Sequence, residues 1–227
     1  MGLFDSLKNS LANSAKNAIN STINGAKSNV SSNITSSISK SVNSAANAIK
    51  NNVNKAVNNT TKTYKFAKIP ASLEELKALP EAKLTDYFAS AALAVLALNV
   101  CATDKELGLQ MLDFLNGPNE ITGQDSQFLE FQFMDGKNYI PRSYFKGATP
   151  ENNYTPDTPY EISVTENPYS KDNFNEGYIT LWITSGGADS PRSVGLRTKK
   201  STGEWFLNSY KGLLTDIRIP KEKDAWA

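Results

Sequence analysis

The chain has no histidine and a single cysteine among its 227 residues. Without histidine it cannot build a Ser-His-Asp or Cys-His nucleophile, and it cannot bind zinc through imidazole. One cysteine, Cys101, allows neither an intrachain disulfide nor a cysteine-only zinc site, and it fits a reducing compartment. The sequence also lacks a nucleotide-binding fingerprint. We therefore predict no metal site and no cofactor.

Long apolar runs are missing as well. The longest, Tyr87–Leu98, is interrupted only by Ser90 and is too short to cross a bilayer, which takes about 20 residues. The N-terminus has no continuous apolar segment of the kind found in secretory signals. We expect a cytoplasmic protein, which lies peripherally at the inner face of the membrane if its N-terminal region binds lipid.

The N-terminal region is poor in the residues that shape globular domains. Ser28–Val57 has no proline, glycine, acidic or aromatic residue and consists mostly of Ser, Asn and Lys. Residues 1–62 contain seven lysines and one aspartate, a net charge of +6, whereas residues 63–227 have a net charge of −5. The overall charge of +1 thus hides a basic arm on an acidic body. Such asymmetry suggests that the arm meets an anionic surface.

The arm nevertheless has the periodicity of a helix. Its apolar residues recur every three or four positions, and several are spaced by eleven, as in Ile23, Ile34, Ala45 and Ala56. Eleven residues over three turns is about 3.67 per turn, so a narrow apolar stripe stays on one side of an α-helix. The predicted stripe comprises Leu3, Phe4, Leu7, Leu11, Ile19, Ile23, Val30, Ile34, Ile38, Val42, Ile49 and Val53.

Three interpretations of the arm are open at this point. In the first, it is an interfacial helix on a lipid surface, where small apolar side chains and sparse lysines require great length. In the second, it self-associates into a homo-oligomeric bundle, as eleven-residue repeats favour. In the third, it is a solvated tail. Nucleic acid is not an expected partner, since the arm has no arginine and only Phe4 for stacking.

The body has the pattern of an α+β domain, in which helices come first and strands follow. Ser72 and Glu75 form a predicted capping box for the first helix. Further helices are expected from the apolar segment 84–101 and from the segments 104–117 and 123–134. Strands are predicted at 160–166, 178–185, 192–199 and 204–210, with 213–220 as a last strand or edge segment.

These patterns predict three parts for the chain. Residues 1–62 form a long amphipathic helical arm, residues 63–70 form a linker, and residues 71–227 form the α+β domain. In that domain the helical segment is expected to pack on an antiparallel sheet, because the last two strands are joined by the hairpin-turn sequence KSTG. About 150 residues suffice for one good hydrophobic core.

Two loops of the body are candidate sites. The segment 139–160 is long and irregular, with four prolines and four tyrosines. The segment 185–192, SGGADSPR, could present backbone N–H groups to an anion, or it could be a tight turn closed by an internal Asp189–Arg192 ion pair. Candidate ligand- or partner-binding residues are Arg142, Tyr144, Tyr154, Gly186, Gly187, Asp189 and Arg192.

Several of these segments also carry a resemblance. The run PRSYFKGATPENNYTPDTPY, followed by SGGADSPR, GEWFL, DIRIP and a C-terminal DAWA, is similar to an uncharacterised bacterial domain family of unknown function. The resemblance covers residues 70–227 and does not include the arm. It implies a bacterial, cytoplasmic protein, and it implies no activity.

The sequence therefore favours a non-enzymatic binding or scaffold protein. No carboxylate spacing marks an acid/base pair, so no catalytic residue is predicted. The arm is expected to associate with a membrane surface and to tether an acidic α+β module, which is open to a protein partner. The alternatives are a self-assembling structural protein, and a small-ligand or enzyme module that uses the loops 139–160 and 185–192.

Overall fold

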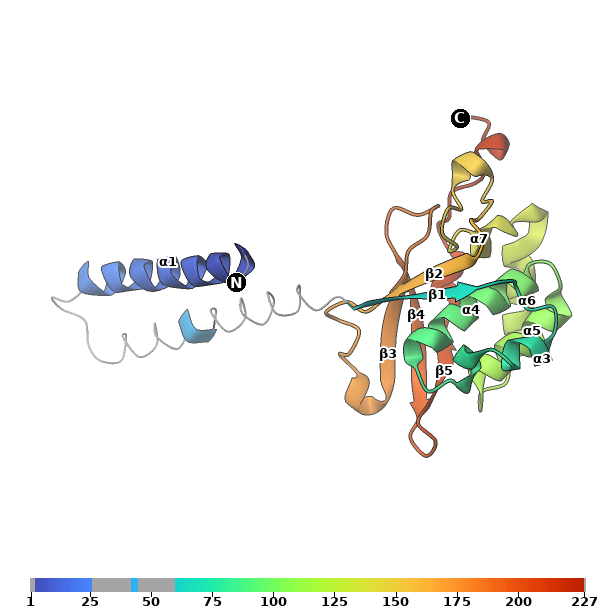
Figure 1. Cartoon of the computed structure of the whole chain (residues 1–227), viewed down its shortest axis with the longest axis horizontal. Helices are drawn as coiled ribbons and strands as arrows, with labels where there is room; N and C mark the ends of the chain where they lie inside the picture. The colour runs from blue at the N-terminus through green and yellow to red at the C-terminus, as the bar shows by residue number, and fades with distance from the viewer. Residues whose placement is uncertain (1–2, 26–41, 45–59, 227) are drawn as a thin grey trace. The chain divides into compact units, whose positions relative to one another are not determined.

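The computed structural model describes residues 3–25, 42–44 and 60–226. The chain divides into two compact units, Met1–Asn54 and Lys55–Ala227, and each is described by itself. In the first unit α1 spans Leu3–Gly25, and residues 42–44 are helical (Figure 1). The predicted helix is therefore present over 23 residues. The predicted stripe positions Val30, Ile34, Ile38, Ile49 and Val53 lie outside the described residues.

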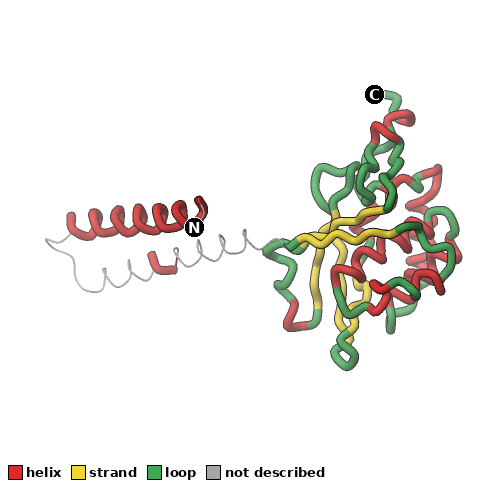
Figure 2. The backbone as a smooth tube through the Cα atoms, in the orientation of Figure 1, coloured by secondary structure: helices red, strands yellow, loops and turns green. Residues whose placement is uncertain are grey.

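The second unit contains the expected helices followed by strands. Its helices are α3 (Leu73–Lys77), α4 (Tyr87–Cys101), α5 (Lys105–Asn116), α6 (Gly123–Phe133) and α7 (Tyr139–Arg142). Its strands are β1 (Thr61–Phe66), β2 (Tyr160–Thr165), β3 (Tyr178–Ile183), β4 (Arg192–Lys199) and β5 (Glu204–Ser209). The α+β class is confirmed, and Figure 2 shows the helices gathered beside the strands.

The five strands form one antiparallel sheet in the order β1-β2-β3-β4-β5. The segment 63–70, expected to be a linker, instead contains most of β1, which pairs with β2 along its full length from Thr61–Thr165 to Phe66–Tyr160. Sequence patterns missed this strand because TKTYKF has polar residues at four of its six positions. Its place is decided by pairing across about 100 residues of chain.

The expected last strand at 213–220 is absent. Lys211–Leu214 is instead a short 3₁₀-helical turn in which the neighbouring residues Leu213 and Leu214 are both buried. Adjacent side chains on a strand point to opposite faces, so a strand could bury only one of them in the same core. The turn buries both.

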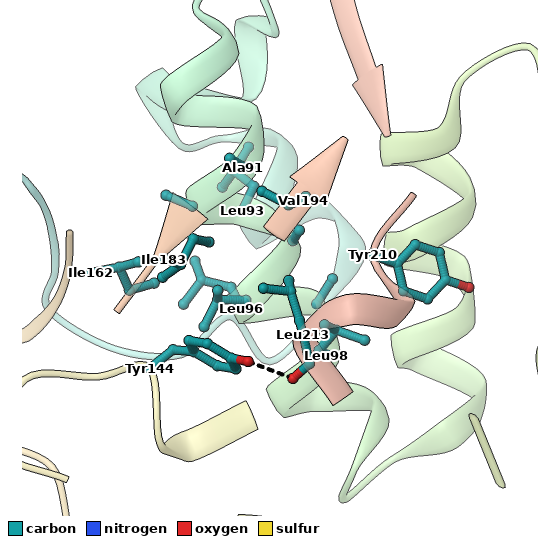
Figure 3. Close-up of a cluster of buried hydrophobic side chains, with 14 of the residues drawn as sticks. Ala91, Leu93, Leu96, Leu98, Tyr144, Ile162, Ile183, Val194, Tyr210 and Leu213 are labelled. Atoms are coloured by element: carbon teal, nitrogen blue, oxygen red, sulfur yellow. Dashed lines mark hydrogen bonds between the residues drawn. The ribbon is translucent and has the colours of Figure 1, made fainter. Parts of the chain in front are cut away.

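Helix α4 is the centre of the core. Asp86 caps its N-terminus by accepting a hydrogen bond from the Phe88 N–H, and all residues from Phe88 to Cys101 are buried. Figure 3 shows its side chains, including Leu93 and Leu96, beside Ile162, Ile183 and Val194 of the sheet. A helix that is apolar all round belongs in a core. The sheet therefore presents its buried face to α4.

The predicted cap of the first helix is present with one change of partner. The Ser72 side chain accepts a hydrogen bond from the Glu75 N–H at 3.1 Å, as expected. The Glu75 carboxylate, however, accepts from the Ala71 N–H at 2.9 Å and pairs with Lys68. The backbone hydrogen bond from Ala71, followed by the hydrogen bond from Lys68, lowers the pKa of Glu75.

Candidate functional site

Helix α1 is the first candidate interface. The stripe residues Leu11, Ile19 and Ile23 lie within it, and Leu11 and Ile23 are exposed, Leu11 to 64%. Leu3, Phe4 and Leu7 also lie within the helix bounds. Asn13 and Asn20 are exposed and, by helical rotation, lie on the side opposite Leu11. Apolar and polar side chains are thus both exposed along this helix.

Across the described ranges 3–25, 42–44 and 60–226, no helix combines the length and the apolar character needed to cross a bilayer. Helix α1 is long enough, but Ser, Asn and Lys recur along it.

The second candidate is a cluster of three loops of the second unit, 139–160, 185–192 and 210–222. The Gly186 N–H donates to the Ser143 carbonyl at 2.8 Å, which joins the first two loops. The Arg218 N–H donates to the Gly187 carbonyl at 2.9 Å, which joins the second and third. Segments separated by about 70 residues therefore form one structural unit.

The glycine pair in the second loop does not form the anion-binding nest that its sequence suggests. The Gly186 N–H is bonded to Ser143, and the Gly187 N–H donates to the Ser185 hydroxyl at 3.0 Å. The glycines instead permit close packing: a Cβ on Gly186 would lie 2.0 Å from the Ala148 carbonyl oxygen. A Cβ on Gly187 would meet the Tyr154 hydroxyl at 2.2 Å.

Tyr144 and Tyr154 connect the first loop to the third. The Tyr144 hydroxyl donates to the Leu213 carbonyl at 2.6 Å (Figure 3), and the Tyr154 hydroxyl donates to the Arg218 carbonyl at the same distance. Burial raises the pKa of both phenols, that of Tyr154 to about 12. Both hydroxyls therefore stay protonated near neutral pH and act as donors inside the protein.

Tyr154 also has an unusual backbone conformation. It and Asn153 both have φ of +55°, in the left-handed region that side chains rarely adopt. The Tyr154 ring stacks on Tyr139 with centroids 5.4 Å apart and is fully buried. Its hydrogen bond and its burial hold this strained turn in place.

The predicted Asp189–Arg192 ion pair is replaced by other partners. Asp189 pairs with Arg218, 2.7 Å from carboxylate to guanidinium. Arg192 instead donates to the carbonyls of Thr215 at 3.1 Å and Asp216 at 2.8 Å. Arg142, in the last turn of α7, is half-buried.

The polar groups of this three-loop cluster hold the loops to one another. Tyr144, Tyr154, Asp189, Arg192 and the N–H groups of the glycine pair all interact with protein groups. Loop sites that bind small ligands present convergent polar groups to a pocket. Here the corresponding groups are directed at neighbouring loops.

A polar cluster that the sequence analysis missed lies where the chain enters the sheet. Asp86 accepts from the Lys62 ammonium at 2.8 Å, from the Tyr64 hydroxyl at 3.0 Å and from the Phe88 N–H at 3.0 Å. Burial alone would raise the pKa of Asp86, but these hydrogen bonds outweigh it and lower the pKa. The interactions fasten β1 to the start of α4.

Acidic and cysteine side chains are the candidate metal ligands and nucleophiles in the described parts of the chain. No group of three or more Cys, Asp or Glu side chains there is arranged to hold a metal ion. Cys101 is buried at the end of α4, and burial raises the pKa of its thiol to about 11. A thiol that is buried and protonated is a poor nucleophile.

Comparison with known families identifies the body. A family model described as "Domain of unknown function (DUF6935)" matches residues 68–221. This match spans more than half of the chain, so the chain belongs to that family, as the sequence resemblance to an uncharacterised domain indicated. No curated protein matches the chain. No solved structure matches it either.

Proposed function

We propose that this member of a family of unknown function is a tethered binding protein. The basic arm associates peripherally with an anionic membrane surface on the cytoplasmic side and holds the α+β domain there as a non-enzymatic module. The observation that supports this most directly is α1, a 23-residue helix on which the predicted stripe residues Leu11 and Ile23 are exposed.

Burial of the apolar side would supply part of the binding free energy. A Leu or Ile side chain moved from water into an apolar environment contributes about 1.5–3 kcal/mol. Each lysine near an anionic leaflet contributes about 1 kcal/mol, and residues 1–62 have a net charge of +6. These contributions must exceed the cost of ordering a segment rich in Ser and Asn, which explains why the stripe would need to be long.

Self-assembly is the second candidate. The eleven-residue spacing and the small Ile, Val and Ala side chains suit close packing between copies of the arm. The arm lacks the regular Glu–Lys pairs that flank the seam of soluble coiled coils. Lipid association is therefore the better-supported candidate, and the oligomeric state of the free protein separates the two.

The test is flotation of the full chain with vesicles of phosphatidylglycerol and phosphatidylcholine. The variant Leu11→Asp with Ile19→Asp places two negative charges on the apolar side and should lose most binding. The matched variant Asn13→Asp with Asn20→Asp adds the same charge to the opposite side and should weaken binding only slightly. Circular dichroism should show helix gained by the unmodified chain on these vesicles.

Equal loss of binding in the two variants would show that charge alone matters and that the stripe is not the contact. A chain that ignores vesicles of any composition would remove the lipid proposal. If the same chain instead sediments as an oligomer whose population rises with protein concentration, the self-assembly alternative takes its place.

A further inference from the structure

A small basic hollow lies between the β4–β5 hairpin and the loop that follows α5. It encloses about 260 Å³, near the lower end of the range for small-ligand sites. The residues that line this hollow, named here the hairpin hollow, are Pro118, Asn119, Arg197, Thr198, Lys199 and Phe206. None of them is acidic.

Two cations stand on the same side of β4 within this hollow. Arg197 and Lys199 are two positions apart on the strand, so their side chains lie on one face about 7 Å apart at the backbone. Both are exposed, and neither forms an ion pair within the described part of the chain. Glu204 is opposite Lys199 in the strand register, outside the lining. The body is acidic overall, so this pair is a local exception.

The Arg197 side chain is held by a neighbouring ring. Its guanidinium carbon lies 5.2 Å from the centre of the Tyr178 ring on β3, within cation–π range. Tyr178, Arg197 and Phe206 are directly opposite one another in the registers of β3, β4 and β5. They form a row across the sheet in which a cation stands between two aromatic rings. Such a contact reduces the freedom that Arg197 would lose on binding a ligand.

The apolar wall of the hollow is Phe206, whose position depends on Gly117. Gly117 ends α5 with φ of +62°, and a Cβ there would lie 2.2 Å from the Phe206 ring. Only glycine allows the loop to pass this close to the ring. Phe206 remains half-buried, and Pro118 and Asn119 close the hollow on the loop side.

We propose that the hairpin hollow binds a small organic anion that has a flat apolar part. The anionic group, a carboxylate, phosphate ester or sulfonate, contacts Arg197 and Lys199, and the flat part lies against Phe206. The volume suits a molecule of one or two rings and excludes a folded protein segment. This inference is independent of lipid association by the arm, and it would give the α+β domain a ligand of its own.

The experiment titrates the full chain with three probes and follows backbone amide shifts in nitrogen-15 NMR spectra. Naphthalene-2-sulfonate carries both the charge and the rings, sodium phosphate carries only charge, and 2-naphthol carries only the rings. The sulfonate should shift the amides of 197–199 and 206. It should bind about tenfold more tightly than either partial probe, since it alone combines hydrogen bonds to charged groups with contact to the ring.

Two variants locate the site. Arg197→Gln with Lys199→Gln should weaken sulfonate binding at least about tenfold. The control Lys83→Gln with Lys221→Gln removes the same charge from exposed residues that do not line the hollow, and it should leave binding unchanged. Phe206→Leu should weaken binding of the sulfonate but not of phosphate. Urea unfolding of each variant verifies that the fold is kept.

Equal binding of 2-naphthol and the sulfonate would overturn the proposal, because the cations would then have no role. Equal weakening by the two charge variants would also overturn it, since the effect would be one of overall charge. Phosphate that binds as tightly as the sulfonate would remove the flat apolar part from the ligand class and contradict the role of Phe206.

Discussion

Helices α1 and α4 differ in almost every respect except their backbone. In α4, fourteen of fifteen residues are buried and none is charged. In α1, residues 9–23 are exposed apart from Ile19, and lysine, asparagine and serine recur along the helix. The first is a helix surrounded by the core, and the second leaves the apolar residues Leu11 and Ile23 exposed.

This difference shows that helical periodicity and helical environment are separate properties. A helix that is apolar on all sides, such as α4, is buried in the interior of its own domain. A helix with a narrow apolar stripe, as predicted for α1, gains stability when that stripe is covered by another surface, whether lipid or protein. The two helices should therefore respond differently to the same kind of mutation.

The largest difference is expected for truncation of a leucine. Leu96→Ala in α4 removes a fully buried side chain and should lower the free energy of unfolding by about 2–5 kcal/mol. Leu11→Ala in α1 should change it by less than about 0.5 kcal/mol, because Leu11 is exposed. Urea unfolding followed by tryptophan fluorescence measures both. A loss of more than about 1 kcal/mol in Leu11→Ala would mean that α1 contributes to the stability of the folded chain.

A smaller effect is expected for a glycine that packs directly against the backbone of a neighbouring loop. Gly186→Ala places a Cβ against the backbone oxygen of Ala148 and should lower the free energy of unfolding by about 1–3 kcal/mol. Gly123→Ala is the matched control, because a Cβ at this position, the first of α6, meets nothing within 4 Å. The control should be neutral or stabilising by up to about 1 kcal/mol. Equal stability of the two variants would contradict the close approach of the loops.

The smallest effect concerns the cluster that fastens β1 to α4. Because the folded-state pKa of Asp86 is depressed, its contribution to stability is present above its unfolded pKa of about 3.9 and is lost as pH falls through the folded value. Asp86→Asn should lose about 0.5–1 kcal/mol at pH 7, a modest amount because Lys62 and Asp86 are partly exposed.

The same variant provides its own control at low pH. The difference between Asp86→Asn and the unmodified chain should begin to shrink as the pH falls below about 3.9, because protons then bind the unfolded carboxyl more readily than the native one. Urea unfolding at pH 7, 5 and 3 measures this. A difference that stays constant across the three pH values would show that the charge of Asp86 does not stabilise the link between β1 and α4.

Sequence patterns predicted the elements that are formed by residues close to one another in the chain. The apolar run of α4, the hairpin turn between β4 and β5 and the Ser72 cap each depend on residues that are close in sequence, and the structure contains all three. The strand β1 was missed because its partner lies about 100 residues away. Its own residues show no alternation of apolar and polar side chains that would identify it.

In the candidate loops, too, contacts between residues far apart in the chain could not be predicted from the sequence. The sequence correctly singled out 139–160 and 185–192 as unusual, and the structure places them together with 210–222. It could not show that the partner of Asp189 is Arg218, 29 residues away, and not its neighbour Arg192. Likewise, nothing local indicates that the glycine N–H groups are already bonded within the fold.

The sequence by itself determined the absence of histidine chemistry, the division into a basic arm and an acidic body, and the helical period of the arm. These follow from composition and spacing, which need no partner. Only the tertiary structure decided which polar groups are satisfied internally and which remain open. The three-loop cluster uses its polar groups within the fold, whereas Arg197 and Lys199 remain exposed above Phe206. That distinction depends on contacts between segments far apart in the chain, because only the folded structure determines the distances between their polar groups.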